Sequence, residues 1–164
     1  MQSEKIRVDR EGAPPAGEIY VSAGTAAVLG FNEIRMDVAP TTAYLMLGGR
    51  CSMACGFCAQ ARGSHASALA LSRITWPPYP LPAVAERLAG AVARGAIRRA
   101  CIQVTVVRDA FEETLAAVRV LRAASDVPID VAILPANLGE VEALLDAGVD
   151  HIGFGLDAAC RRVF

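Results

Sequence analysis

The sequence predicts an α/β fold, namely part of a (βα) barrel of the TIM type, with about four parallel strands and covering helices. Short apolar segments alternate with longer segments whose apolar residues recur at helical spacing, which is typical of βαβ units around a parallel sheet. Hydrophobic residues make up 54% of the 164 residues. No apolar run reaches the roughly 18 residues of a membrane span, so the apolar residues fit short strands that are buried on both faces.

The predicted elements alternate regularly in the second part of the chain. We expect strands at residues 44–47, 100–107, 128–134 and 150–156, and helices at residues 82–94, 111–124 and 138–147. Residues 59–81 show no such periodicity and are expected to be mostly irregular. Within them the proline-rich segment 76–80 is expected to form a stiff loop that either packs on the core or covers the site.

Composition divides the chain into three parts. Residues 1–17 contain two adjacent prolines and two glycines and are predicted to be a flexible lead. Residues 18–42 are predicted to be a connector, with Ile19–Val21 as a candidate strand and Thr25–Leu29 as a candidate helical turn. Residues 43–164 form the core. Four strands are too few to close a barrel, since about eight are needed, so we expect a half barrel, a fragment, or a chain that a protein partner completes.

Side chains alternate along each predicted strand, and two strands have one polar or small face. On one strand this face carries Cys101, Gln103 and Thr105, and on the last strand it carries His151, Gly153, Gly155 and Asp157. We expect the polar face to line the barrel interior and the apolar face to meet the helices. In βα barrels the reactive groups lie at the carboxyl ends of the strands, where we expect the site. We expect His151 to have a structural role.

Three of the five cysteines lie in one short segment, Cys51-Ser-Met-Ala-Cys55-Gly-Phe-Cys58, directly after the first core strand. Thiolates are the usual ligands of iron–sulfur clusters, and three of them hold three irons of a 4Fe-4S cluster. The fourth iron keeps an open position for a small molecule. The alternative is a structural zinc site with His65 as fourth ligand, although zinc ligands generally come in spaced pairs.

The C-x3-C-x2-C spacing, with Phe57 just before the last cysteine, resembles the signature of the radical S-adenosyl-L-methionine (SAM) superfamily. The resemblance implies that Cys51, Cys55 and Cys58 bind a 4Fe-4S cluster whose open iron binds SAM, and that Phe57 lies near the adenine. It also implies an electron donor of the flavodoxin or ferredoxin type, and a 5′-deoxyadenosyl radical that abstracts hydrogen from a substrate.

Residues 43–160 are most similar to the biotin synthase-like branch of that superfamily. Residues 147–157 resemble its fourth-strand segment, which implies that Asp157 lies near the SAM ribose; a helix N-cap explains this residue equally well. The family's Gly-Gly-Glu at the second strand is absent. The resemblance therefore leaves Gln103 or Thr105 to bind the SAM amino group, unless these two side chains only satisfy each other.

The same branch implies a transferase that inserts sulfur into an unactivated C–H bond of a small-molecule or carrier-bound substrate, as in enzymes of the biotin and lipoyl synthase type. Cys101 falls at or near a cysteine that biotin synthase uses for a second cluster, but Ala132 stands where another such ligand is expected. We therefore predict no second cluster. Free cysteines are among the most buried residues, so Cys101 fits a core position, and Cys160 fits a surface thiol.

The charge and the N-terminus limit the other classes of function. The net charge is -1, from 16 basic and 17 acidic residues, so we expect no nucleic-acid surface. The first 18 residues are polar and lack the apolar segment of a signal peptide. The sequence therefore predicts a cytoplasmic protein that does not interact with a membrane.

Overall fold

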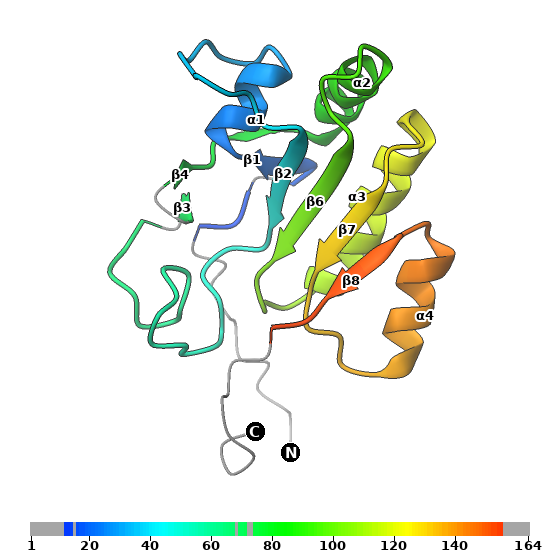
Figure 1. Cartoon of the computed structure of the whole chain (residues 1–164). Coiled ribbons are helices and arrows are strands. Elements are labelled where there is room, and N and C mark those ends of the chain that lie inside the picture. The colour runs from blue at the N-terminus through cyan, green and yellow to red at the C-terminus, as the bar shows by residue number, and fades with distance from the viewer. Residues whose placement is uncertain (1–11, 15, 68, 72–73, 156–164) are drawn as a thin grey trace, which may run out of the picture.

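The computed structural model describes residues 12–14, 16–67, 69–71 and 74–155. Its centre is a six-stranded sheet with the strand order β5-β1-β2-β6-β7-β8 (Figure 1). These strands are β1 (Glu18–Val21), β2 (Thr42–Leu47), β5 (Pro78–Pro80), β6 (Arg99–Val104), β7 (Ile129–Ala132) and β8 (His151–Gly153). β2, β6, β7 and β8 run parallel to one another, whereas β1 is antiparallel to both β2 and β5. The predicted α/β class is confirmed, and the sheet is open and mostly parallel. β1 and β5 add antiparallel pairs that the predicted parallel sheet did not include.

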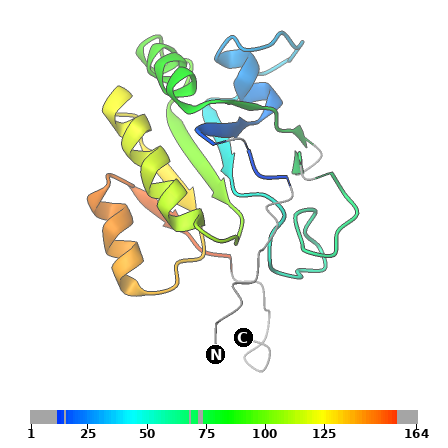
Figure 2. The same ribbon diagram turned by 180° about the vertical axis from the view of Figure 1, so that it is seen from behind.

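Three helices cover the same face of this sheet (Figure 2). They are α2 (Leu81–Ala93), α3 (Ala110–Ala124) and α4 (Leu138–Asp146), and the short helix α1 (Ala23–Val28) joins β1 to the segment before β2. The beginning of α4 is fixed by Asn137, whose side chain accepts a hydrogen bond from the backbone N–H of Glu140 at 3.1 Å. None of the described helices has the length and apolar composition needed to cross a bilayer.

The main core lies between these helices and the sheet. Leu45, Ile102 and Val131 are neighbours on adjacent strands, and all three side chains are fully buried. They pack with apolar residues of the helices such as Leu88 and Leu121. The predicted apolar strand face therefore does meet the helices. We call the opposite side, which carries Cys101 and Gln103, the helix-free face.

Residues 59–81 differ from the expected irregular loop. They contain β5 and two further short strands, β3 (Ala70–Leu71) and β4 (Ile74–Thr75), which pair with each other. β5 forms because β1 offers it backbone partners, with Tyr20 opposite Pro78 and Glu18 opposite Pro80. Proline cannot donate a backbone hydrogen bond, and an edge strand tolerates this. Trp76 is buried with Tyr20 and Met46, so it packs on the sheet.

Candidate functional site

The cysteine loop and the ends of the parallel strands enclose a cleft of about 280 Å³. This volume is close to the lower end of the roughly 300–1,000 Å³ found for small-molecule sites. Its lining includes Cys51, Cys55, Cys58, Gln103, Thr105, Gly153 and Gly155. The structure therefore brings five of the predicted site residues together at the carboxyl edge of the parallel strands, where βα enzymes bind their ligands.

The turn between β2 and the cysteine loop is fixed by Thr105. Its hydroxyl accepts a hydrogen bond from the backbone N–H of Gly49 at 3.0 Å. Gly48 has a φ of +90°, and a Cβ atom at this position would collide with the Thr105 hydroxyl. Gly48 is therefore needed for the close approach of the loop to the residue that follows β6.

The cysteine loop is held on both sides by protein contacts. The guanidinium of Arg50 donates hydrogen bonds to the carbonyls of Ala59 at 2.9 Å and Ala66 at 2.7 Å. The backbone N–H of Cys51 donates to the Gln60 carbonyl at 2.9 Å, and that of Ser52 donates to the Val106 carbonyl at 2.8 Å. Contacts within the protein thus define the path of the loop.

The three thiols are half-buried and line the same cleft. The backbone N–H of Met53 lies 3.4 Å from Cys51 Sγ, a contact of the kind that hydrogen bonds to cluster sulfurs provide. Among the described residues, no three His, Cys, Asp or Glu side chains form a ready coordination group. The donor set itself fits an iron–sulfur cluster, and cluster binding requires the three thiols to converge within the cleft.

Gln103 and Thr105, the two candidates for a SAM contact, have separate partners. The amide nitrogen of Gln103 donates to Cys101 Sγ at 3.1 Å, which leaves its Oε1 as the atom that can accept a hydrogen bond from a ligand. Burial raises the pKa of the Cys101 thiol, and the hydrogen bond from Gln103 opposes this shift. The Thr105 hydroxyl serves the turn at Gly49. The two side chains therefore do not satisfy each other.

The remaining predicted site residues lie away from the cleft lining or outside the described residues. Phe57 is 78% exposed and is not part of the cleft lining. His65, the fourth ligand in the zinc hypothesis, is exposed as well. Asp157 and Cys160 lie outside the described residues.

A charged cluster on the helix-free face was missed by the sequence analysis. His151 Nδ1 lies 2.9 Å from Asp130 Oδ1, and the Arg99 guanidinium contacts both oxygens of Asp130 at 2.7 and 2.6 Å. His151 therefore contacts a carboxylate, which the expectation of a merely structural residue did not include. The alternation of side chains indicates which face of its own strand each residue occupies, and the register of β6, β7 and β8 brings these residues together.

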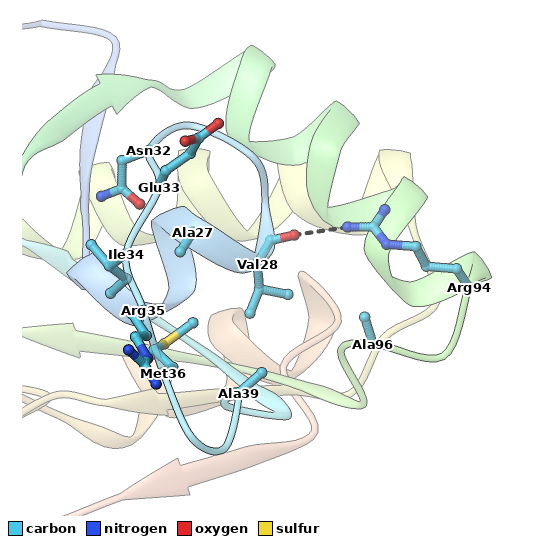
Figure 3. A pocket seen from close by; sticks show the side chains of 10 residues that line it. All are labelled: Ala27, Val28, Asn32, Glu33, Ile34, Arg35, Met36, Ala39, Arg94 and Ala96. Atoms are coloured by element: carbon cyan, nitrogen blue, oxygen red, sulfur yellow. Dashed lines mark hydrogen bonds between the residues drawn. The ribbon is translucent and has the colours of Figure 1, made fainter.

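A second, larger cavity of about 560 Å³ lies at the opposite, amino-terminal edge of the parallel strands (Figure 3). It is formed by the end of α1, the segment 32–39 and the turn after α2. One side is tied together by Arg94, whose guanidinium donates to the Val28 carbonyl at 2.8 Å. The described residues that line this cavity include none of the predicted site residues and no cysteine. The cleft at the cysteine loop is therefore the better candidate site, although it is smaller.

Comparison with protein-family models, curated proteins and solved structures finds no match to the chain.

Proposed function

We propose that the chain is a radical SAM protein in which Cys51, Cys55 and Cys58 hold a 4Fe-4S cluster. When bound and reduced, the cluster and SAM supply a 5′-deoxyadenosyl radical that abstracts hydrogen from a substrate C–H bond. The observation that carries this proposal is the position of the three cysteines. They share one cleft with polar strand-end residues at the carboxyl edge of a parallel sheet.

The contacts of Gln103 and Thr105 favour different roles for these residues in SAM binding. Gln103 has its amide nitrogen on Cys101, so its Oε1 is suited to accept hydrogen bonds from the amino group of SAM. Thr105 supports the turn before Cys51 and positions the loop. We assign Phe57 to the adenine and Asp157 to the ribose by resemblance alone.

We extend the proposal to the barrel and the reaction. The four parallel strands, with α2, α3 and α4 on one face, are compatible with half of a (βα) barrel. The substrate is a small or carrier-bound molecule, and sulfur insertion is the reaction expected from the resemblance. A flavodoxin- or ferredoxin-type protein supplies the electron.

A second candidate function is a cluster-binding protein that needs a partner for catalysis. Within the described residues, the outer edge of β8 pairs with no strand, and His151 and Phe154 beside it are exposed. Unpaired sheet edges invite association, and a site open to water does not protect a radical. A protein partner that covers the helix-free face and the edge of β8 would pair with this edge and would keep water out of the site. The two functions differ in turnover. A partner-dependent protein should cleave SAM at most once on its own and many times after the partner is added, whereas an independent enzyme should turn over repeatedly on its own.

The test is anaerobic reconstitution of the full chain with iron and sulfide. We expect about four irons per chain and the broad absorbance of a cubane cluster. Cys55→Ala should lose both signals, whereas Cys101→Ser, which changes a cysteine outside the cleft lining, should keep them. Binding of zinc with no such absorbance would replace the proposal with a structural metal site.

A further inference from the structure

A row of polar side chains crosses the helix-free face next to the cysteine cleft. Cys101, Asp130 and His151 are direct neighbours on β6, β7 and β8. The adjacent row on the same face is Gln103, Ala132 and Gly153, and all three of these residues line the cleft. Two residues along a strand span about 7 Å. A ligand that extends this far from the cleft along the sheet therefore reaches His151.

The imidazole of His151 has one nitrogen fixed by the protein. Nδ1 lies 2.9 Å from Asp130 Oδ1, and Arg99 holds the same carboxylate at 2.6 Å through Oδ2. The Asp130 side chain is 22% exposed, whereas that of His151 is 64% exposed. Orientation through Nδ1 leaves Nε2 as the nitrogen that is presented to a ligand.

Among the described residues, the charged groups beside His151 form pairs with one another. Arg99 pairs with Asp130 at 2.6 Å, and Arg122 pairs with Asp150 at 2.7 Å. Cys101, the other titratable neighbour, is a thiol whose pKa is raised by burial. Protonation of His151 therefore adds one positive charge that these groups do not balance. An anion that contacts Nε2–H would balance it and make a charge-assisted hydrogen bond.

We propose that His151, oriented by Asp130 and Arg99, is an anion subsite for the substrate that occupies the cysteine cleft. The substrate class is a small organic molecule with a carboxylate or phosphate group, whose reacting end lies beside Gln103, roughly 12 Å away across two strand spacings and two residues along the strand. The identification of this ligand as substrate rests on the proposed function, whereas anion binding at His151 does not require a cluster.

Proton NMR of the full chain tests the subsite, with sodium acetate and inorganic phosphate as separate probes. The chain has two histidines, so the ring signals are assigned with His65→Gln, and exposed His65 serves as an internal control. At a pH of about 5.5 we expect the anion to shift the His151 signals and leave those of His65 unchanged. Acetate binding should weaken toward alkaline pH, because a neutral imidazole offers the anion no charge.

Two variants distinguish an anion site at His151 from general attraction of anions to the protein surface. His151→Gln should abolish the saturable binding measured by calorimetry, and His65→Gln should retain it. Tighter binding of acetate indicates a carboxylate substrate, and tighter binding of phosphate indicates a phosphorylated one. Equal binding by His151→Gln, a pH-independent affinity, or no shift with either anion overturns the proposal. Anion binding by a chain that takes up no iron would refute the proposed function and leave the subsite standing.

Discussion

The hydroxyl of Thr105 accepts a hydrogen bond from the backbone N–H of Gly49 at 3.0 Å, although the two residues are 56 positions apart in the chain. This contact joins the residue after β6 to the turn before Cys51. The neighbouring Gly48, at a φ of +90°, leaves no space for a side chain against the same hydroxyl. The protein thus sets the start of the cysteine loop through its own contacts.

Thr105→Val should test this contact, because valine keeps the shape of threonine and removes the acceptor. We expect the free energy of unfolding of the metal-free chain to fall by about 1 kcal/mol, the net value of a part-buried hydrogen bond. Thr105→Ser keeps the hydroxyl and should lose less. Urea unfolding followed by circular dichroism measures both, and a valine variant as stable as the native chain would contradict the role of the contact.

Arg50→Met should loosen the cysteine loop with little change in overall stability. The variant removes the two hydrogen bonds to the carbonyls of Ala59 and Ala66, and water can replace part of them. Hydrogen exchange measured by mass spectrometry should be faster across residues 51–66 and unchanged in α3. Arg62→Met, at an exposed arginine of the same loop, is the matched control. Unchanged exchange in the Arg50 variant would show that the guanidinium does not hold the loop.

Gln103→Leu should weaken SAM binding and leave the cluster intact. A hydrogen bond to a charged group contributes about 1.5–3 kcal/mol, so we expect a loss of affinity of roughly tenfold or more. Gln103→Glu keeps an acceptor and should bind SAM at least as well as the native chain. Equilibrium dialysis with reconstituted protein gives both affinities. Equal affinity of the leucine variant would remove Gln103 from the site.

Asp150 should make stability depend on pH at the acidic end. The hydrogen bond from the Ile129 N–H, followed by the Arg122 contact, lowers the pKa of this carboxyl below its usual value of 3.8. A group whose pKa is lower in the folded state stabilises the fold above its unfolded pKa. This contribution disappears as the pH falls through the folded pKa. Asp150→Asn should therefore be less stable than the native chain at pH 7, and the difference should vanish at low pH.

The control for this pH dependence is Asp146→Asn, which changes an exposed aspartate at the end of α4. It should leave the unfolding midpoint close to that of the native chain at every pH. A constant difference between the Asp150 variant and the native chain, from pH 7 down to low pH, would rule out the carboxylate as the cause.

The sequence was sufficient for the elements whose local pattern and tertiary environment agree. The helix expected at 82–94 is α2, Leu81–Ala93, because Val84 and Leu88 recur on the face that meets the core. The strand expected at 100–107 ends earlier, at Val104, since the chain then turns to meet the cysteine loop. β5 could not be predicted, because its prolines gain strand geometry only by pairing with β1.

The position of the three cysteines in the candidate site could be predicted from the sequence, and their contacts only in part. The three cysteines follow a segment that the sequence predicts to be a strand. In the structure they line one cleft together with Gln103. The partner of Thr105 lies on a turn far away in sequence, so no local pattern indicates this contact. The partner of Gln103 is Cys101, two residues away on the same strand face. The contact of His151 with Asp130 depends on the register of β7 and β8, which the sequence does not show.

Electron paramagnetic resonance of the reduced, reconstituted chain, recorded with and without SAM, tests the central claim most directly. SAM binding at an open iron should change the spectrum of the cluster, and a variant that lacks Cys55 should show neither spectrum. We expect the spectrum of the cluster to shift clearly on adding SAM. Adenosine, which lacks the methionine part of SAM, should cause no shift. An intact cluster whose spectrum is unchanged by saturating SAM would contradict the assignment to radical SAM chemistry.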